Sequence, residues 1–253
     1  MIARVVASVR GAQWLAEGWR LFRASPLGWL VMVFAYLMGT MLLSLLPLAG
    51  PVLVAIAVPA LSVGFMAASR AASRRQPVEL SMLFAGFRER TPAQLVLGAV
   101  YAIGFFGAIV GSSAADDGAL MRLLFEPVQA SPGDDPLPGM LAAVVLYLPT
   151  MALLWFAPVL VAWHGFAPLK ALFYSVMACW LNLGAFVVYA IALGLLLFAI
   201  LGAATLVAVV GPAGASAAAE RSLVFPLALV VMPTLFASYF ASYRDVFAAP
   251  QEP

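Results

Sequence analysis

Charged side chains are scarce in this sequence. Of its 253 residues only 9% are Asp, Glu, Lys or Arg, whereas 65% are hydrophobic. A water-soluble domain carries about 25% charged residues, because its surface must interact with water. The apolar residues here also form long, uninterrupted runs. This composition argues against a soluble fold and predicts an integral membrane protein.

Cysteine and histidine each occur once, as Cys179 and His164. A lone cysteine cannot form an internal disulfide, so Cys179 is interpreted as a small apolar packing residue. A zinc site takes three or four protein ligands, which one histidine and one cysteine do not supply. His164 is expected at the membrane interface. We therefore predict no metal site and no cofactor.

Motifs for nucleotide and acyl-transfer chemistry are also missing. No Gly-Lys-Ser/Thr phosphate loop occurs, which excludes a P-loop ATPase. No Gly-x-Ser-x-Gly nucleophile motif occurs either. An intramembrane enzyme would need polar side chains at one depth, and the candidates are Asn182, His164 and Thr150. We predict that the protein is not an enzyme and has no catalytic residues.

Six apolar segments are long enough to cross a bilayer. Crossing the roughly 30 Å hydrocarbon core takes about 20 residues in a helix, and backbone groups in lipid must be paired within the segment. The predicted spans are about 27–46, 51–69, 95–113, 140–163, 183–210 and 223–243. No span carries Asp, Glu, Lys or Arg in its interior, which disfavours proton coupling through carboxylates. We predict an all-α bundle of six transmembrane helices, forming one domain over residues 1–253.

The basic residues lie mostly on one side of these spans. Of the 13 Lys and Arg residues, 11 lie before the first span or in the segments that follow the second, fourth and sixth spans. The two exceptions are Arg122 and Arg221. The positive-inside rule places these segments in the cytoplasm. They include the lead, residues 1–26, and the tail, residues 244–253. Segment 114–139 is then a periplasmic acidic loop, interpreted as solvated. The predicted location is a bacterial inner membrane.

A weak internal repeat runs through the chain. Each of three copies begins with a Leu-Phe pair, at residues 21–22, 83–84 and 172–173, and continues into a span. The next span of each copy contains a proline, and the three are Pro59, Pro158 and Pro233. Proline removes a helical hydrogen bond and bends the helix. The pattern predicts three helical hairpins with cytoplasmic interfacial amphipathic helices, and makes the prolines candidates to line a cavity; chance recurrence in a leucine-rich chain is the alternative.

The lead before the first span has the pattern of a basic amphipathic helix. At about 100° per residue its apolar and polar residues separate into two arcs: Ser8, Gly11, Ala12, Leu15, Trp19 and Phe22 against Arg10, Gln13, Glu17, Arg20 and Arg23. Such a helix suits the surface of the cytoplasmic leaflet, although it could serve only as a topology anchor. The candidate lipid-headgroup contacts are Trp14, Trp19, Arg20, Arg23, Arg70, Arg74, Arg75 and Arg88.

Four segments carry a family resemblance. They are GWRLFRASP at Gly18–Pro26, LPLAGP at Leu46–Pro51, PALSVGFM at Pro59–Met66 and LFAGFR at Leu83–Arg88. The sequence resembles an uncharacterised proteobacterial family of six-span inner-membrane proteins. That family is distantly similar to the membrane domain attached to some glycerophosphoryl diester phosphodiesterases. The resemblance implies a fold, a location and a hint of lipid-related work, while the soluble catalytic domain has no counterpart here.

Two functions are consistent with this sequence. The first is a non-catalytic membrane protein that interacts with lipids, or with a so far unidentified protein partner, through its interfacial helices. The alternative is a transporter or flippase for an apolar or lipidic substrate that uses the proline-bent spans. Nucleic-acid binding is not expected, because the basic surface is too small.

Overall fold

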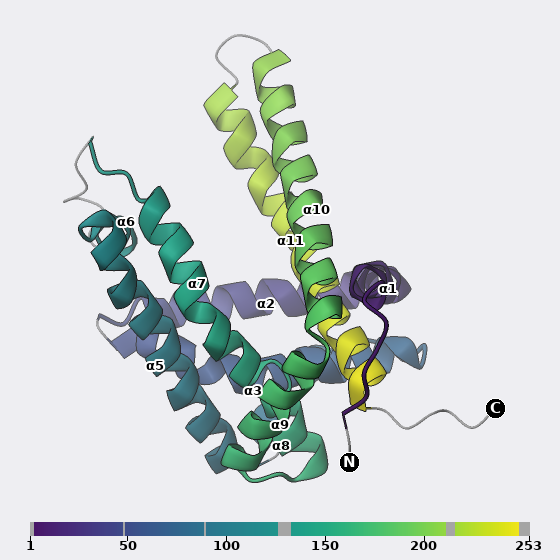
Figure 1. Ribbon diagram of the computed structural model, residues 1–253. Coiled ribbons are helices and arrows are strands. Elements are labelled where there is room, and N and C mark those ends of the chain that lie inside the picture. Colours follow the sequence, from purple (N-terminus) through teal and green to yellow (C-terminus); the bar gives the residue numbers. More distant parts are fainter. Residues whose placement is uncertain (1–2, 48, 89, 126–132, 211–215, 248–253) are drawn as a thin grey trace. The chain divides into compact units, whose positions relative to one another are not determined.

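The computed structural model describes residues 3–47, 49–88, 90–125, 133–210 and 216–247. Helices make up nearly all of these residues, and no strand occurs among them (Figure 1). The helices are α1 Arg10–Ala24, α2 Pro26–Ser44, α3 Ala49–Ser73, η1 Leu80–Phe84, α4 Ala85–Arg88, α5 Thr91–Asp116, α6 Ala119–Phe125, α7 Leu137–Leu154, α8 Ala157–His164, α9 Pro168–Leu181, α10 Leu183–Val210 and α11 Ser216–Phe247.

The described residues contain five helices that are long and apolar enough to cross a membrane. They are Pro26–Ser44, Ala49–Ser73, Thr91–Asp116, Leu137–His164 and Leu183–Ile200. The all-α membrane fold is thereby confirmed. The sixth predicted span, residues 223–243, lies within α11, and the side chains of its first residues, 223–228, are outside those described. That span and the three-fold repeat stay predictions. α9 has 14 residues, and at about 1.5 Å per residue it is too short to cross.

The fourth span is broken rather than bent. α7 ends at Leu154 and α8 begins at Ala157, with Pro158 in the first turn of the new helix. Proline has no N–H to donate to the preceding turn, so it begins a helix more readily than it continues one. The Ser175 hydroxyl accepts a hydrogen bond from the Phe156 amide at 2.9 Å and donates one to the Ala152 carbonyl at 2.7 Å. A side chain from α9 thus pairs the backbone groups that the break leaves over.

The predicted acidic loop contains a helix. Asp117 and Gly118 both have positive φ and reverse the chain after α5. The Asp116 carboxylate accepts hydrogen bonds from the amides of Gly118 and Leu120, which stabilises the start of α6. Arg122 of α6 forms an ion pair of 2.8 Å with Asp134. Several of these acidic groups therefore have structural partners, which corrects the interpretation of a merely solvated loop.

The chain divides into two compact units. Unit 1 comprises residues 1–41, 62–85 and 177–253, and unit 2 comprises residues 42–61 and 86–176. In unit 1, α1 packs against both α10 and α11, and these two long helices also pack on each other (Figure 1). Aromatic rings join α2, α3 and α11: the rings of Phe65 and Phe236 stack with centroids 3.7 Å apart, and Tyr36 meets both edge-on.

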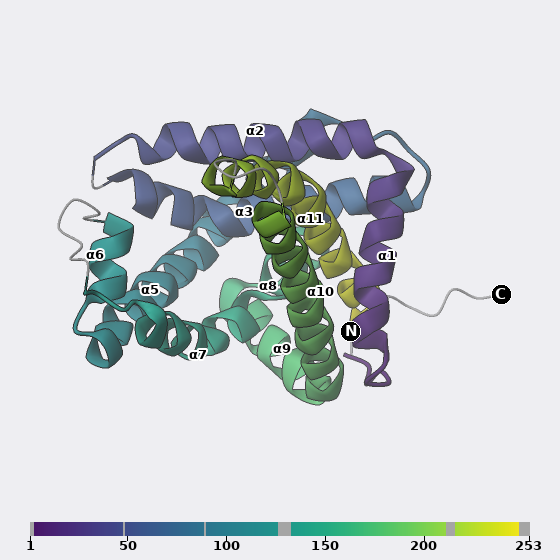
Figure 2. The same cartoon turned by 90° about the horizontal axis from the view of Figure 1, so that it is seen from above.

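Unit 2 is built on the pair α5 and α7, which lie side by side (Figure 2). Gly98 of α5 lies directly against the Ile56 carbonyl of α3, where a side chain would overlap the backbone. Gln94, 1% exposed, donates a hydrogen bond of 2.9 Å to the Pro158 carbonyl. α5 therefore contacts the chain just after the break in the fourth span.

Candidate functional site

The amphipathic lead forms α1, and two glycines allow it to pack closely in unit 1. A Cβ atom on Gly11 would overlap the Ala185 carbonyl of α10, and one on Gly18 would overlap the Thr234 carbonyl of α11. The two glycines are seven residues apart, so they lie on one face of α1. This face carries the backbone of α1 directly onto the backbones of α10 and α11.

Trp14 fills the same interface. Its side chain is fully buried, and its ring meets the ring of Phe186 edge-on at a centroid distance of 5.4 Å. The indole N–H donates a hydrogen bond of 2.8 Å to the Asp245 carboxylate on the last turns of α11. Trp14 thus packs inside the protein and has no surface for lipid headgroups, which corrects the prediction for this residue.

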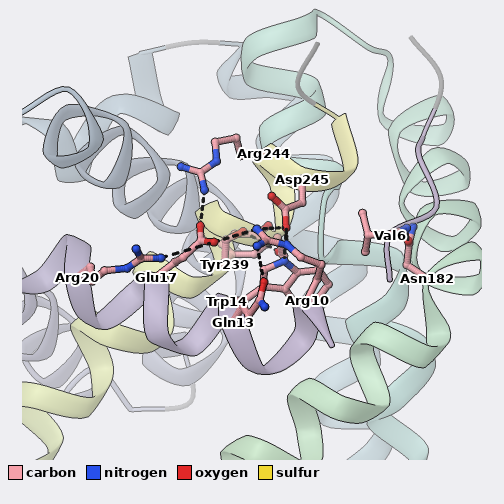
Figure 3. A network of polar contacts seen from close by, with 11 residues as sticks. Val6, Arg10, Gln13, Trp14, Glu17, Arg20, Asn182, Tyr239, Arg244 and Asp245 are labelled. Carbon is pink, nitrogen blue, oxygen red and sulfur yellow. Dashed lines mark hydrogen bonds and ion pairs between the residues drawn. The ribbon is translucent and has the colours of Figure 1, made fainter. Parts of the chain in front are cut away.

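Charged side chains surround Glu17, which is 8% exposed (Figure 3). One carboxylate oxygen lies 2.8 Å from an Arg10 Nη and 3.8 Å from an Arg20 Nη, and the other accepts a hydrogen bond from Arg244. Arg10 also pairs with Asp245 at 2.6 Å. We refer to Arg10, Glu17, Arg20, Arg244 and Asp245 as the α1–α11 cluster.

The surroundings of Arg10 favour the charged form of its guanidinium group. Burial by itself would lower the pKa of Arg10, but the hydrogen bonds and charges of Asp245 and Glu17 outweigh it and raise that pKa. The cluster holds three guanidinium groups and two carboxylates, so it carries one net positive charge. It also joins α1 to the end of α11. α11 continues to Phe247, so Arg244, predicted in a tail, lies on this helix.

The extended segment before α1 is fixed by Asn182, between α9 and α10. The Asn182 side-chain oxygen accepts from the Val6 amide at 2.8 Å, and its nitrogen donates to the Arg4 and Ala178 carbonyls at 2.9 Å each. Asn182 is 2% exposed. The sequence makes Asn182 a candidate for intramembrane chemistry, and in the structure both the oxygen and the nitrogen of its amide have backbone partners.

The opposite face of α1 is open. Trp19 is 42% exposed, the side chain of Arg20 is 71% exposed, and Arg23 is exposed as well. Leu27, at the start of α2, is 78% exposed. A cationic and aromatic surface thus adjoins the start of a membrane span, the arrangement typical of a helix at the lipid–water interface.

The other predicted contacts lie on other elements. Arg70, Arg74 and Arg75 are exposed at and just beyond the end of α3, and Arg88 is exposed on α4. All three predicted kink residues are buried: Pro59 inside α3, Pro158 in α8 and Pro233 in α11. Pro59 and Pro158 belong to unit 2 and Pro233 to unit 1. A shared cavity stays a prediction.

The pairing in the α1–α11 cluster does not follow from the sequence pattern. Periodicity places Arg10 and Glu17 on the polar arc of the lead, a helix that suits the surface of the cytoplasmic leaflet. Their spacing of seven residues shows that they share a face. The pair Arg244-Asp245 at the end of the last apolar segment was the available signal for their partners, but nothing in the sequence links the two distant segments.

The apolar helices define an all-α integral membrane protein. The sequence is 39% identical to the probable inner membrane protein BTH_II0599 of Burkholderia thailandensis, over 98% of this chain and 94% of that protein. The chain belongs to the family of this inner-membrane protein. No family model and no solved structure matches the chain.

Proposed function

We propose that this protein is a non-catalytic, six-span inner-membrane protein whose helix α1 lies on the cytoplasmic surface and binds anionic lipid headgroups. The observation that carries the proposal is the exposed face of α1, with Trp19, Arg20 and Arg23, on a helix whose other face is held by α10 and α11. A partner protein that recognises the same face is the competing interpretation.

The proposal places both termini on the same side of the membrane. The α1–α11 cluster joins a helix that precedes the first span to the end of the helix that contains the last predicted span. This contact supports a single compartment for both ends, as an even number of spans would give. The excess of basic residues in the same segments favours the cytoplasm as that compartment.

The charge on α1 accounts for lipid selectivity. An arginine near an anionic membrane surface gains about 1 kcal/mol, and Trp19 suits the headgroup region, where the indole body is apolar and its N–H meets water. Because α1 is already folded and packed, little conformational entropy is lost when lipid binds. We therefore expect phosphatidylglycerol to bind more tightly than phosphatidylcholine.

The test measures lipid affinity of purified protein at low salt by native mass spectrometry. Arg20→Gln with Arg23→Gln should weaken phosphatidylglycerol binding by about 2 kcal/mol, roughly thirtyfold, if each arginine contributes fully. Arg20→Lys with Arg23→Lys is the matched control, because it keeps both charges at the same positions. Equal affinity for wild type and the Gln variant would reject the lipid-binding role of α1.

The resemblance to the membrane domain of glycerophosphoryl diester phosphodiesterases supports lipid-related work. It also keeps the alternative, a transporter or flippase for an apolar or lipidic substrate, under consideration. The specific observation for that alternative is the break between α7 and α8, since interrupted transmembrane helices commonly form substrate sites in transporters. A fluorescent-lipid flipping assay in proteoliposomes tests it; flipping that is lost in Ser175→Ala and kept in Ser113→Ala would favour this function over the first.

A further inference from the structure

Glu17 occupies the position of an anion among three guanidinium groups. Arg10 and Arg20 come from α1 and Arg244 comes from α11, and their Nη atoms converge on the two oxygens of this single carboxylate. Guanidinium groups pair with phosphate as they do with carboxylate, through two parallel N–H···O bonds. The geometry that binds the Glu17 side chain would therefore also bind a phosphate group.

The three arginines remain accessible while Glu17 does not. The side chains of Arg20 and Arg244 are 71% and 42% exposed, that of Arg10 is 30% exposed, and that of Glu17 is 11% exposed. The cluster also retains one positive charge that its own two carboxylates leave uncompensated. An external anion can thus reach the guanidinium groups, and the residual charge attracts it.

We propose that Arg10, Arg20 and Arg244 form a phosphate-binding site, and that Glu17 is a built-in competitor that occupies it. A phosphate group, from a phospholipid headgroup or from a small soluble phosphate, displaces the Glu17 carboxylate from Arg20 first, because that contact is the longest at 3.8 Å. This inference rests on the proposed lipid-binding role of α1 and adds its regulation: the chain itself limits how tightly α1 binds anions.

Removing the competitor should therefore strengthen binding. Glu17→Gln keeps the size and hydrogen-bonding capacity of the side chain and removes its charge. We expect phosphatidylglycerol affinity to rise about fivefold, which corresponds to one arginine set free for the headgroup. Glu17→Asp is the matched control: it keeps the charge, and its affinity should stay near that of the wild type.

A purely structural ion pair predicts the opposite sign. If Glu17 only holds α1 in place, then Glu17→Gln loosens the helix and leaves affinity unchanged or lowers it, and either result overturns the proposal. Adding Arg244→Gln to Glu17→Gln should abolish the gain, because one of the three guanidinium groups is then missing. A gain that survives Arg244→Gln would also overturn it.

Two probes identify the source of the phosphate. The same variants are titrated with phosphatidylglycerol and with inorganic phosphate. A gain for the lipid alone assigns a headgroup site, a gain for both assigns a general phosphate site, and no gain with either overturns the proposal. Should Glu17→Gln not fold, Arg244→Gln in the otherwise unchanged chain must lower affinity about fivefold, with Arg244→Lys near the wild type.

Failure of this inference is separable from failure of the proposed function. Loss of lipid binding in Arg20→Gln with Arg23→Gln, without a gain in Glu17→Gln, would leave the lipid-binding helix and remove only the competitor. No loss in the Arg20 and Arg23 variant would remove the proposed function itself.

Discussion

Replacing Gly18 with alanine tests how tightly α1 is seated. An added Cβ would overlap the Thr234 carbonyl and lie 2.8 Å from the Ser238 amide nitrogen. Both are backbone atoms of α11, so no side-chain rotation can relieve the overlap, and one helix must move. Overpacking of this kind costs about 1–3 kcal/mol. Against it stands the higher helix propensity of alanine, worth about 1 kcal/mol over glycine.

Gly39 of α2 provides the matched control. A Cβ atom there would meet nothing within 4 Å, so Gly39→Ala has the propensity gain without the overlap. The difference between these two terms lowers the free energy of unfolding of Gly18→Ala by up to about 2 kcal/mol. We expect Gly39→Ala to leave the free energy of unfolding equal or to raise it by up to about 1 kcal/mol. Denaturant titration in detergent, followed by circular dichroism, measures both variants. Equal stability of the two variants would refute close packing of α1 on α11.

Three further predictions concern buried polar contacts. Glu17→Ala leaves Arg10 without one of its partners and should lower the free energy of unfolding by about 1–3 kcal/mol, less than for a fully buried pair because the arginines are partly exposed. The same denaturant titration measures it, and an unchanged free energy of unfolding would show that the cluster has no structural role. Ser175→Ala removes both hydrogen bonds at the break in the fourth span and should cost about 1–3 kcal/mol. Ser113→Ala, at a half-buried position where the hydroxyl donates to the Val110 carbonyl of its own helix, should cost less; equal losses of thermal stability would contradict this. Asn182→Leu frees the segment before α1 and should speed its proteolysis, which N-terminal sequencing of the fragments detects; unchanged cleavage rates would contradict the anchoring role.

The membrane fold could be predicted from the sequence because hydropathy acts locally. Continuous apolar runs of about 20 residues have one stable conformation in lipid, the helix. Each span can therefore be recognised from its own residues, without knowledge of what it packs against. Five of the six predicted spans coincide with apolar helices. The amphipathic lead could also be predicted from its periodicity, and the structure has α1 there, at Arg10–Ala24.

The α1–α11 cluster could not be predicted in this way. Glu17 and Arg244 are 227 positions apart, and periodicity shows which face of a helix is polar without showing what that face meets. The burial of Trp14 was missed for the same reason, because an interfacial tryptophan and a packed one look alike in sequence. The break at Pro158 depends on Ser175 pairing the free backbone groups, a contact between two separate helices.

The lipids that stay bound to the protein when it is extracted from native membranes test whether α1 binds anionic lipid. Mass spectrometry would give the ratio of anionic to zwitterionic lipid for wild type, for Arg20→Gln with Arg23→Gln, and for the corresponding Lys variant. We expect enrichment of anionic lipid with the wild type and the Lys variant, and its loss with the Gln variant. The bulk membrane ratio in all three would contradict the assignment of α1 as a lipid-binding helix.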